Sequence, residues 1–303
     1  MPGGSAEGIG RRRSRGAAGA TDPDAASARK RAALVLPALV FILVLFVYPL
    51  LSLIGTSFED HGGGLSLAQY SRAIGTPVYT KILVKTLWVS AAVTALCFSL
   101  GYPLAYALST ARGLLKTALL FAVLMPFWTN LLVRAYGWIV TLHPHGLVNS
   151  ALLATGLIRE PIPLVYNTTG MLIGMTQIML PYMTLPLSAA MERMDLRLIH
   201  ASRSLGASAP RTFLHVFFPL TLPGVFAGAL LVFVLCLGFF VIPALLGGRS
   251  DILIAQLINY NLTTTLNWSF AAALSTILLV TTLGIYLVAH RWFRLGMLWG
   301  ERA

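Results

Sequence analysis

The segment LIHASRSLGASAPRTFLHVFFPLTLPG, Leu198–Gly224, decides the fold of this chain. Its polar, basic first half separates two long apolar runs, residues 161–191 and 212–248, which contain no Asp, Glu, Lys or Arg. A membrane-spanning helix needs about 20 mostly apolar residues, and each run is long enough for one. The pattern therefore predicts two spans joined by a short helical element that lies at the membrane surface.

The composition of the whole chain points the same way. The 303 residues are 57% hydrophobic and 11% charged, whereas soluble domains carry about 25% charged residues. The net charge of +12 could indicate a nucleic-acid partner, but the basic residues lie outside the apolar runs, so membrane topology explains them and no nucleic acid is expected. Cys97 and Cys236 each lie inside an apolar run, which predicts buried thiols rather than a disulfide framework.

Charge-free stretches define six predicted spans and an all-α, polytopic membrane fold. The six helices are expected near residues 33–55, 86–109, 116–136, 166–190, 222–246 and 269–290. A further charge-free stretch, 135–158, contains His143, Pro144 and Gly146. Its broken composition is more typical of an external loop with short helices than of a seventh span.

The distribution of basic residues predicts that both termini are cytoplasmic. With that orientation, 16 Lys and Arg residues fall on the inside and six on the outside, as the positive-inside rule requires. Residues 1–31 are expected to form a disordered basic cytoplasmic tail, 32–295 the membrane domain with a cytoplasmic loop at about 191–222, and 296–303 a second cytoplasmic tail.

The cytoplasmic loop has the pattern of a helix–turn–helix element. Asp195–Ser208 alternates apolar and polar residues with helical spacing, and Gly206 interrupts it. Ser208-Ala209-Pro210 has the residue types that begin a new helical turn. The small residues before the turn would let another protein approach closely.

The spacing in this loop resembles the EAA loop of ABC-importer permeases, which reads Glu-Ala-Ala, three residues, Gly, nine residues, Ile-x-Leu-Pro. Here His200-Ala201-Ser202 is followed at those distances by Gly206 and by Val216-Phe217-Phe218-Pro219. His200 replaces the Glu, Ser202 the second Ala and Phe218 the Leu. The resemblance implies an ATPase-coupling loop, whose expected residues are His200, Ala201, Ser202, Gly206, Pro210, Val216 and Pro219.

Further motifs are similar to the spermidine/putrescine branch of that family. They are Pro126-Phe127-Trp128-Thr129, Leu180-Pro181-Tyr182-Met183 and Pro243-Ala244-Leu245-Leu246-Gly247-Gly248. The resemblance implies an inner-membrane, multi-pass permease that lies in the lipid bilayer with a second homologous permease, a cytoplasmic ATPase dimer and a periplasmic or external solute-binding protein. The chain has no phosphate-binding loop of the Gly-x-x-x-x-Gly-Lys-Ser/Thr type, so no cofactor is expected in it. ATP and Mg²⁺ would bind the partner ATPase, and this chain would not be an enzyme.

A second set of residues is a candidate translocation path. It comprises Trp128, Thr129, Asn130, Tyr136, Gln177 and Tyr182. Aromatic faces attract cations by roughly 0.5–2 kcal/mol, which suits a path that must release its cargo. The same residues could instead form interfacial belts or bond neighbouring helices. Arg134 is expected to extend to the outer membrane face, and His143 with His145 is not expected to hold a metal.

Three alternatives remain open at the sequence level. The same type of importer could carry another small solute, such as an amino-phosphonate, iron or another organic cation. A secondary transporter or channel would be expected to carry intramembrane carboxylates or inverted repeats, and neither is seen. A membrane-embedded enzyme would need a metal cluster or a nucleophile–base pair in the spans, which the sequence does not indicate.

Overall fold

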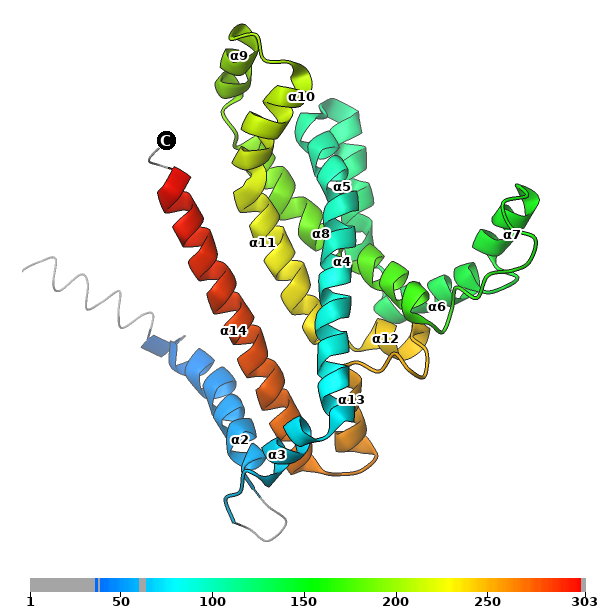
Figure 1. Cartoon of the computed structure of the whole chain (residues 1–303), viewed down its shortest axis with the longest axis vertical. Coiled ribbons are helices and arrows are strands. Elements are labelled where there is room, and N and C mark those ends of the chain that lie inside the picture. The colour runs from blue at the N-terminus through cyan, green and yellow to red at the C-terminus, as the bar shows by residue number, and fades with distance from the viewer. Residues whose placement is uncertain (1–35, 38, 60–63, 301–303) are drawn as a thin grey trace, which may run out of the picture. The chain divides into compact units, whose positions relative to one another are not determined.

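A computed structural model describes residues 36, 37, 39–59 and 64–300 of the chain (Figure 1). Across these residues the secondary structure is helical, apart from one isolated β-bridge between Glu59 and Leu65. This confirms the all-α fold. The predicted N-terminal tail, 1–31, lies outside the described residues, whereas the predicted C-terminal tail begins inside the last helix, α14 (Trp268–Gly300).

The chain divides into two compact units, residues 1–52 and 53–303. The described part of the first unit holds the π-helical stretch η1 (Leu43–Val47) and the beginning of α2 (Tyr48–Ser57). Together these form a helix, Leu39–Ser57, that is long and apolar enough to cross a membrane. The span expected near 33–55 is therefore confirmed in its described part.

Four further spans belong to the second unit. They are α4 (Pro77–Thr110), α8 (Thr168–Glu192), a continuous helix Ala209–Leu237, and α14. The continuous helix consists of α10 (Ala209–Thr212), the π-helical stretch η2 (Phe213–Phe217) and α11 (Phe218–Leu237). The helices expected near 86–109, 166–190 and 269–290 are thus confirmed, and α4 begins nine residues earlier, with Pro77 in its first turn.

The third expected span, near 116–136, is wrong as a straight helix. The helix α5 (Gly113–Trp128) ends inside the expected span, and α6 (Leu131–Leu142) begins three residues after Trp128. The pair 113–128 and 131–154 is bent by 104°. The Asn130 side chain accepts a hydrogen bond from the Leu132 N–H at 2.8 Å, so it caps a new helix and the old one cannot continue. The short α7 (Leu147–Ala154) confirms the prediction of short helices within 135–158.

The fifth expected span, near 222–246, is wrong at both ends. The helix already begins at Ala209, because α10 and η2 run into α11 without a break. It stops at Leu237, followed by Gly238, and a separate short helix, α12 (Val241–Leu246), follows. Three other short helices complete the second unit: α3 (Ala68–Gly75), α9 (Leu196–Ser204) and α13 (Ile254–Thr263).

The core of the second unit is the bundle of α4, α8 and α11, which pack extensively against one another (Figure 1). Gly228 permits this packing, because a Cβ atom there would lie 2.9 Å from Met183 Sδ and 3.0 Å from the Met183 carbonyl oxygen. Small residues let membrane helices approach closely in this way. Cys97 and Cys236 are buried in the same core as free thiols, as predicted.

Candidate functional site

The helix α9 is closed at both ends by its own sequence. The Asp195 side chain accepts a hydrogen bond from the Arg197 N–H at 2.9 Å and caps the first turn. At the other end the Gly206 N–H donates to the Arg203 carbonyl at 2.9 Å, and the Ala207 N–H donates to the Ser202 carbonyl at 3.2 Å. These two bonds form a Schellman motif, which requires the left-handed conformation that Gly206 adopts at φ +84°.

The role of Gly206 is therefore conformational. A Cβ atom at this position would meet no other atom within 4 Å, so space alone does not demand glycine. The left-handed backbone does, because it costs an ordinary residue about 1–2 kcal/mol. The turn directs the chain back into α10, where Pro210 occupies the first turn, and Ser202 Oγ lies 3.2 Å from Thr212 Oγ1.

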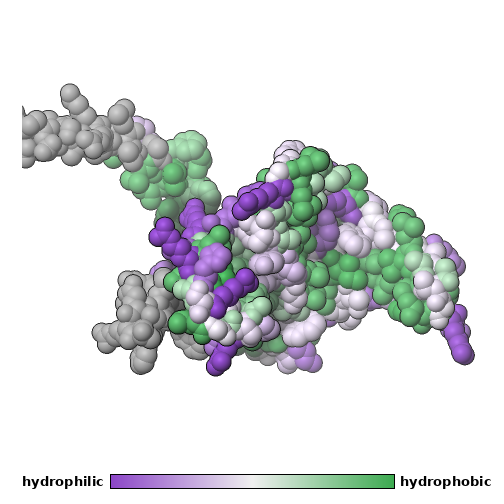
Figure 2. Space-filling model, turned by 90° about the horizontal axis from the view of Figure 1, so that it is seen from above, coloured by the Kyte–Doolittle hydropathy of each residue, from purple (hydrophilic) through white to green (hydrophobic). Residues whose placement is uncertain are grey.

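A groove of about 670 Å³ lies between α9 and the beginning of the continuous helix; we call it the α9–α11 groove. Its lining residues are Leu198, Ala201, Ser202, Leu205, Gly206, Ala207, Arg211, His215, Val216, Pro219 and Leu220. Five of the seven predicted coupling residues line it. The other two, His200 and Pro210, are exposed beside it. Figure 2 looks onto this end of the second unit and shows hydrophilic residues gathered there among apolar surface.

The α9–α11 groove is connected directly to three spans. Ile199 of α9 packs against a buried cluster formed by Ala105 of α4, Leu187 and Met191 of α8, and Phe217 of η2. The Tyr102 hydroxyl of α4 lies 3.2 Å from the Thr221 hydroxyl. The Tyr102 ring contacts the rings of Phe213 and Phe218. Close-packed interiors transmit displacement rather than absorb it. Ile199 therefore joins α9 to α4, α8 and the continuous helix by direct packing.

The predicted path residues gather around the break between α5 and α6, and around the middle of α8. Trp128 ends α5 and is 73% exposed, and Thr129 and Asn130 form the break. Tyr136 on α6 is 60% exposed.

The other two predicted path residues, Tyr182 and Gln177, lie on α8 and contact α5 and α6. Tyr182 packs edge-on against Phe127, with ring centroids 5.2 Å apart. Gln177 accepts a hydrogen bond from Trp138 Nε1 at 3.4 Å. The six residues therefore belong to one region, although Asn130 is committed to capping α6 and Gln177 to Trp138.

Arg134 lies elsewhere than the sequence indicated. It lines a cavity of about 20 Å³ together with Pro126 and Phe127 of α5 and Ile178, Pro181 and Tyr182 of α8. These residues of α8 are in the middle of a 25-residue span. The expectation that Arg134 extends to the outer membrane face is therefore wrong, because the bend between α5 and α6 turns it inward.

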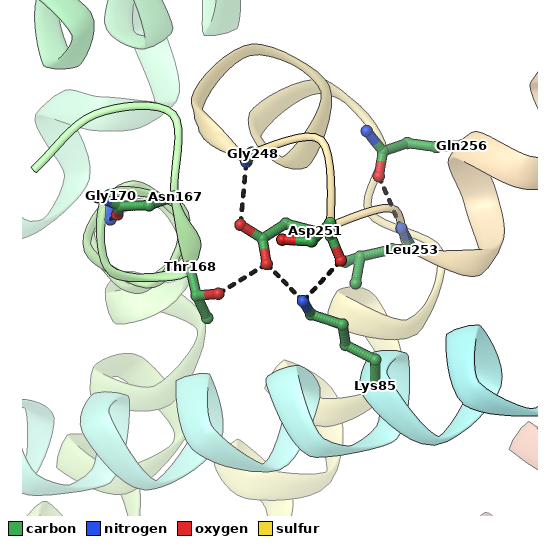
Figure 3. A network of polar contacts seen from close by, with 9 residues as sticks. Lys85, Asn167, Thr168, Gly170, Gly248, Asp251, Leu253 and Gln256 are labelled. Carbon is green, nitrogen blue, oxygen red and sulfur yellow. Dashed lines mark hydrogen bonds and ion pairs between the residues drawn. The ribbon is translucent and has the colours of Figure 1, made fainter. Parts of the chain in front are cut away.

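At the end of the bundle opposite α9, a polar network ties three parts of the chain together (Figure 3). Lys85 of α4 forms an ion pair with Asp251, and its ammonium group donates to the Ser250 carbonyl at 2.8 Å. The Asp251 carboxylate also accepts hydrogen bonds from the Thr168 hydroxyl at 2.7 Å and from the Gly248 N–H at 3.0 Å. The network joins α4, the first turn of α8 and the loop between α12 and α13.

The electrostatics of Asp251 follow from these contacts. Its side chain is 3% exposed. Burial raises the pKa of its carboxyl, but the hydrogen bonds from Lys85, Thr168 and Gly248, with the positive charge of Lys85, outweigh burial and hold the pKa below its ordinary value. Sequence reasoning missed this network, since no local pattern pairs residues 166 positions apart.

Comparison with known proteins agrees with this arrangement. Residues 31–294 match the model of a family described as binding-protein-dependent transport system inner membrane component. The spermidine/putrescine transport system permease protein PotB of Escherichia coli K12 is 36% identical over 255 residues, which are 82% of this chain and 92% of that protein.

Two solved structures share the fold. A bacterial ABC transporter that imports the polysaccharide alginate matches with a TM-score of 0.68 at 17% identity, over 90% of this chain and 97% of that chain. A bacterial alginate ABC transporter in complex with a periplasmic protein bound to an alginate pentasaccharide matches with a TM-score of 0.71 at 16% identity, over 88% and 94% of the two chains. The chain described here therefore belongs to the binding-protein-dependent transport system inner membrane components, the permease subunits of ABC importers, and is a multi-pass inner-membrane protein.

Proposed function

We propose that this permease imports polyamines of the spermidine/putrescine type and forms the translocation path together with a second, homologous permease. The substrate class is supported by the likeness to PotB, which extends over 92% of that protein. Trp128, at the end of α5, is 73% exposed and provides an aromatic face that attracts alkylammonium groups weakly. A weak site suits a path from which the cargo must leave.

The α9–α11 groove is the docking site of a cytoplasmic ATPase in this proposal. One observation carries it: α9 is a separately capped helix whose Ile199 packs directly onto the ends of α4 and α8 and onto Phe217. The groove is lined mainly by apolar side chains, and it also has the basic side chains of Arg211 and His215. An ATPase segment with an apolar face and an acidic end would fit it. ATP and Mg²⁺ bind the ATPase subunits, and this chain contributes α9, the helix that connects the ATPase to the spans.

The coupling mechanism follows from the connection between α9 and the spans. Closure of the ATPase dimer on ATP moves the segment that occupies the groove, and α9 moves with it. Because Ile199 and Phe217 are packed into the ends of the spans, the displacement shifts α8 and α11 between two arrangements of the path. The end that carries α9 is placed in the cytoplasm, and a solute-binding protein delivers substrate at the opposite end.

The test compares two substitutions on the same helix. Ala201→Trp fills the α9–α11 groove, whereas Leu196→Trp adds the same ring at an exposed position of α9 outside it. The permease is purified with its ATPase, and ATP hydrolysis is measured in proteoliposomes with binding protein and spermidine. We expect Ala201→Trp to lose both the bound ATPase and the stimulated hydrolysis, and Leu196→Trp to keep them.

Two results would contradict different parts of the proposal. Retention of the ATPase by Ala201→Trp would place ATPase docking outside the groove. Hydrolysis in the wild-type protein that responds to ferric iron or an amino-phosphonate, but not to spermidine or putrescine, would keep the importer and reject the polyamine substrate.

A further inference from the structure

Arg134 is a cation without a counter-charge in the part of the chain that the structure describes. Its Nε atom is buried and has no hydrogen-bond partner there. The described ion pairs are Lys85–Asp251 and Lys116–Glu192, and neither involves Arg134. An unpaired charge at the depth of the middle of a membrane span is costly and marks a functional contact.

The described residues of this chain offer no acidic side chain at that depth. In the sequence, the runs 32–58, 86–111, 117–133, 161–191, 212–248 and 252–290 contain no Asp or Glu. The acids of the described residues lie at span ends or in loops: Glu59, Glu160, Glu192, Asp195 and Asp251. A second copy of this chain would therefore bring another arginine and no carboxylate. The counter-charge must come from a different molecule.

The substrate is a poor source of that charge. The cavity beside Arg134 has a volume of about 20 Å³, about enough for one water molecule. A polyamine is far larger, and its ammonium groups would be repelled by the guanidinium group. A membrane helix of another subunit is better suited, because the neighbouring face of α6 is apolar and uncovered. Val133, Tyr136 and Val140, spaced three and four residues apart on that face, are 67%, 60% and 69% exposed.

We propose that Arg134 binds a carboxylate on a membrane-spanning helix of a non-identical partner subunit, at the break between α5 and α6. The inference rests on the proposed pairing with a second permease. It assigns the selectivity of that pairing to Arg134. A guanidinium group pairs with a carboxylate through two parallel hydrogen bonds, which makes the contact selective in geometry as well as in charge. The charge pattern favours a mixed pair over two copies of this chain.

The experiment uses the importer assembled in the membrane and purified through a tag on this chain. Arg134→Gln removes the charge and keeps most of the volume, and Arg134→Lys keeps the charge but not the bidentate geometry. Arg159→Gln removes a charge from the loop before α8 and is the matched control. We expect recovery of the second permease to fall by roughly tenfold or more with Arg134→Gln, by less with Arg134→Lys, and not at all with Arg159→Gln.

A charge exchange separates a lost contact from a misfolded chain. Each intramembrane Asp or Glu of the second permease is replaced by Arg and combined with Arg134→Glu. Recovery of the complex in one such combination identifies the partner carboxylate and supports the inference. Wild-type recovery with Arg134→Gln, with only a changed KM for spermidine, would overturn it and place the guanidinium group beside the substrate. Purification of wild-type protein with its ATPase but without any second permease, as two copies of this chain, would overturn both the inference and the proposed pairing.

Discussion

The network around Asp251 makes one prediction that can be worked through quantitatively. Lys85 and Asp251 are not equivalent partners, because the Asp251 side chain is 3% exposed and that of Lys85 is 29% exposed. Lys85→Met leaves a buried carboxylate, and removal of one partner of a buried ion pair costs about 3–5 kcal/mol. The hydrogen bonds from Thr168 and Gly248 remain and reduce this cost to about 3 kcal/mol.

Asp251→Asn should lower the free energy of unfolding by less than Lys85→Met does. The Lys85 ammonium group can turn toward solvent, so the loss is that of the charge-assisted hydrogen bonds, about 2 kcal/mol. The double variant Lys85→Met/Asp251→Asn buries no charge and should be more stable than Lys85→Met alone. Lys81→Met, which removes an exposed charge one turn earlier on α4, is the control.

The pH dependence has a definite sign. The folded-state pKa of Asp251 lies below its ordinary value, so its contribution to stability is complete above about pH 4–5 and is lost as the pH falls through the depressed folded-state pKa. In Lys85→Met the carboxyl loses its cation and protonates at higher pH than in the wild type. The stability difference between this variant and the wild type should therefore narrow as the pH is lowered from 7 to 3.

Thermal unfolding in nanodiscs, followed by tryptophan fluorescence, measures these differences. A loss of about 3 kcal/mol corresponds to a decrease in Tm of roughly 6 °C or more. Equal Tm values for Lys85→Met and wild type would refute the reasoning. So would a difference that does not change with pH, because the carboxylate would then not be the group that is destabilised.

The remaining predictions concern the turn after α9 and the packing of the spans. Gly206→Val should lower the free energy of unfolding by about 1–2 kcal/mol and weaken ATPase binding. Gly206→Asn should bind the ATPase normally, because Asn tolerates a left-handed backbone. Co-purification of the ATPase distinguishes the two variants, and equal binding would exclude a conformational role for Gly206. Gly228→Leu should lower Tm by several degrees, because a Cβ atom there already meets α8 within 3.0 Å. The control Gly284→Leu on α14 should leave Tm unchanged, because a Cβ atom there meets no atom within 4 Å. A similar decrease in Tm in both variants would contradict this. Tyr102→Phe removes the hydroxyl that faces Thr221 and should cost about 0.5–1.5 kcal/mol, measured as the shift in Tm; an unchanged Tm would show that the contact contributes nothing.

One departure from the expected spans and one close helix contact had signals in the sequence. Pro126 and the cap residue Asn130 both indicate the end of one helix and the beginning of another, yet the apolar run around them favoured one straight span. Gly224 and Gly228 form a small-xxx-small spacing that predicts close helix packing. In each case composition over 20 residues outweighed a signal carried by one or two residues.

Other features had no local signal. The position of Arg134 against the middle of α8 depends on the 104° bend, and the bend angle is set by packing rather than by any residue pattern. Five residues of the α9–α11 groove were among the predicted coupling residues, because the motif that named them is local in sequence. Its connection to Ala105 of α4 came from the folded chain alone.

The sequence by itself determined the apolar spans, the surface helix with its turn at Gly206, and the membrane class of the protein. These features depend on hydrophobicity and backbone preference over a few helical turns, which neighbouring residues decide. The tertiary structure decided where the spans break, that Asp251 is paired with Lys85 and that no carboxylate of the described residues pairs with Arg134. Such contacts join residues far apart in the chain, and their energies depend on burial and distance, which exist only after the helices have packed.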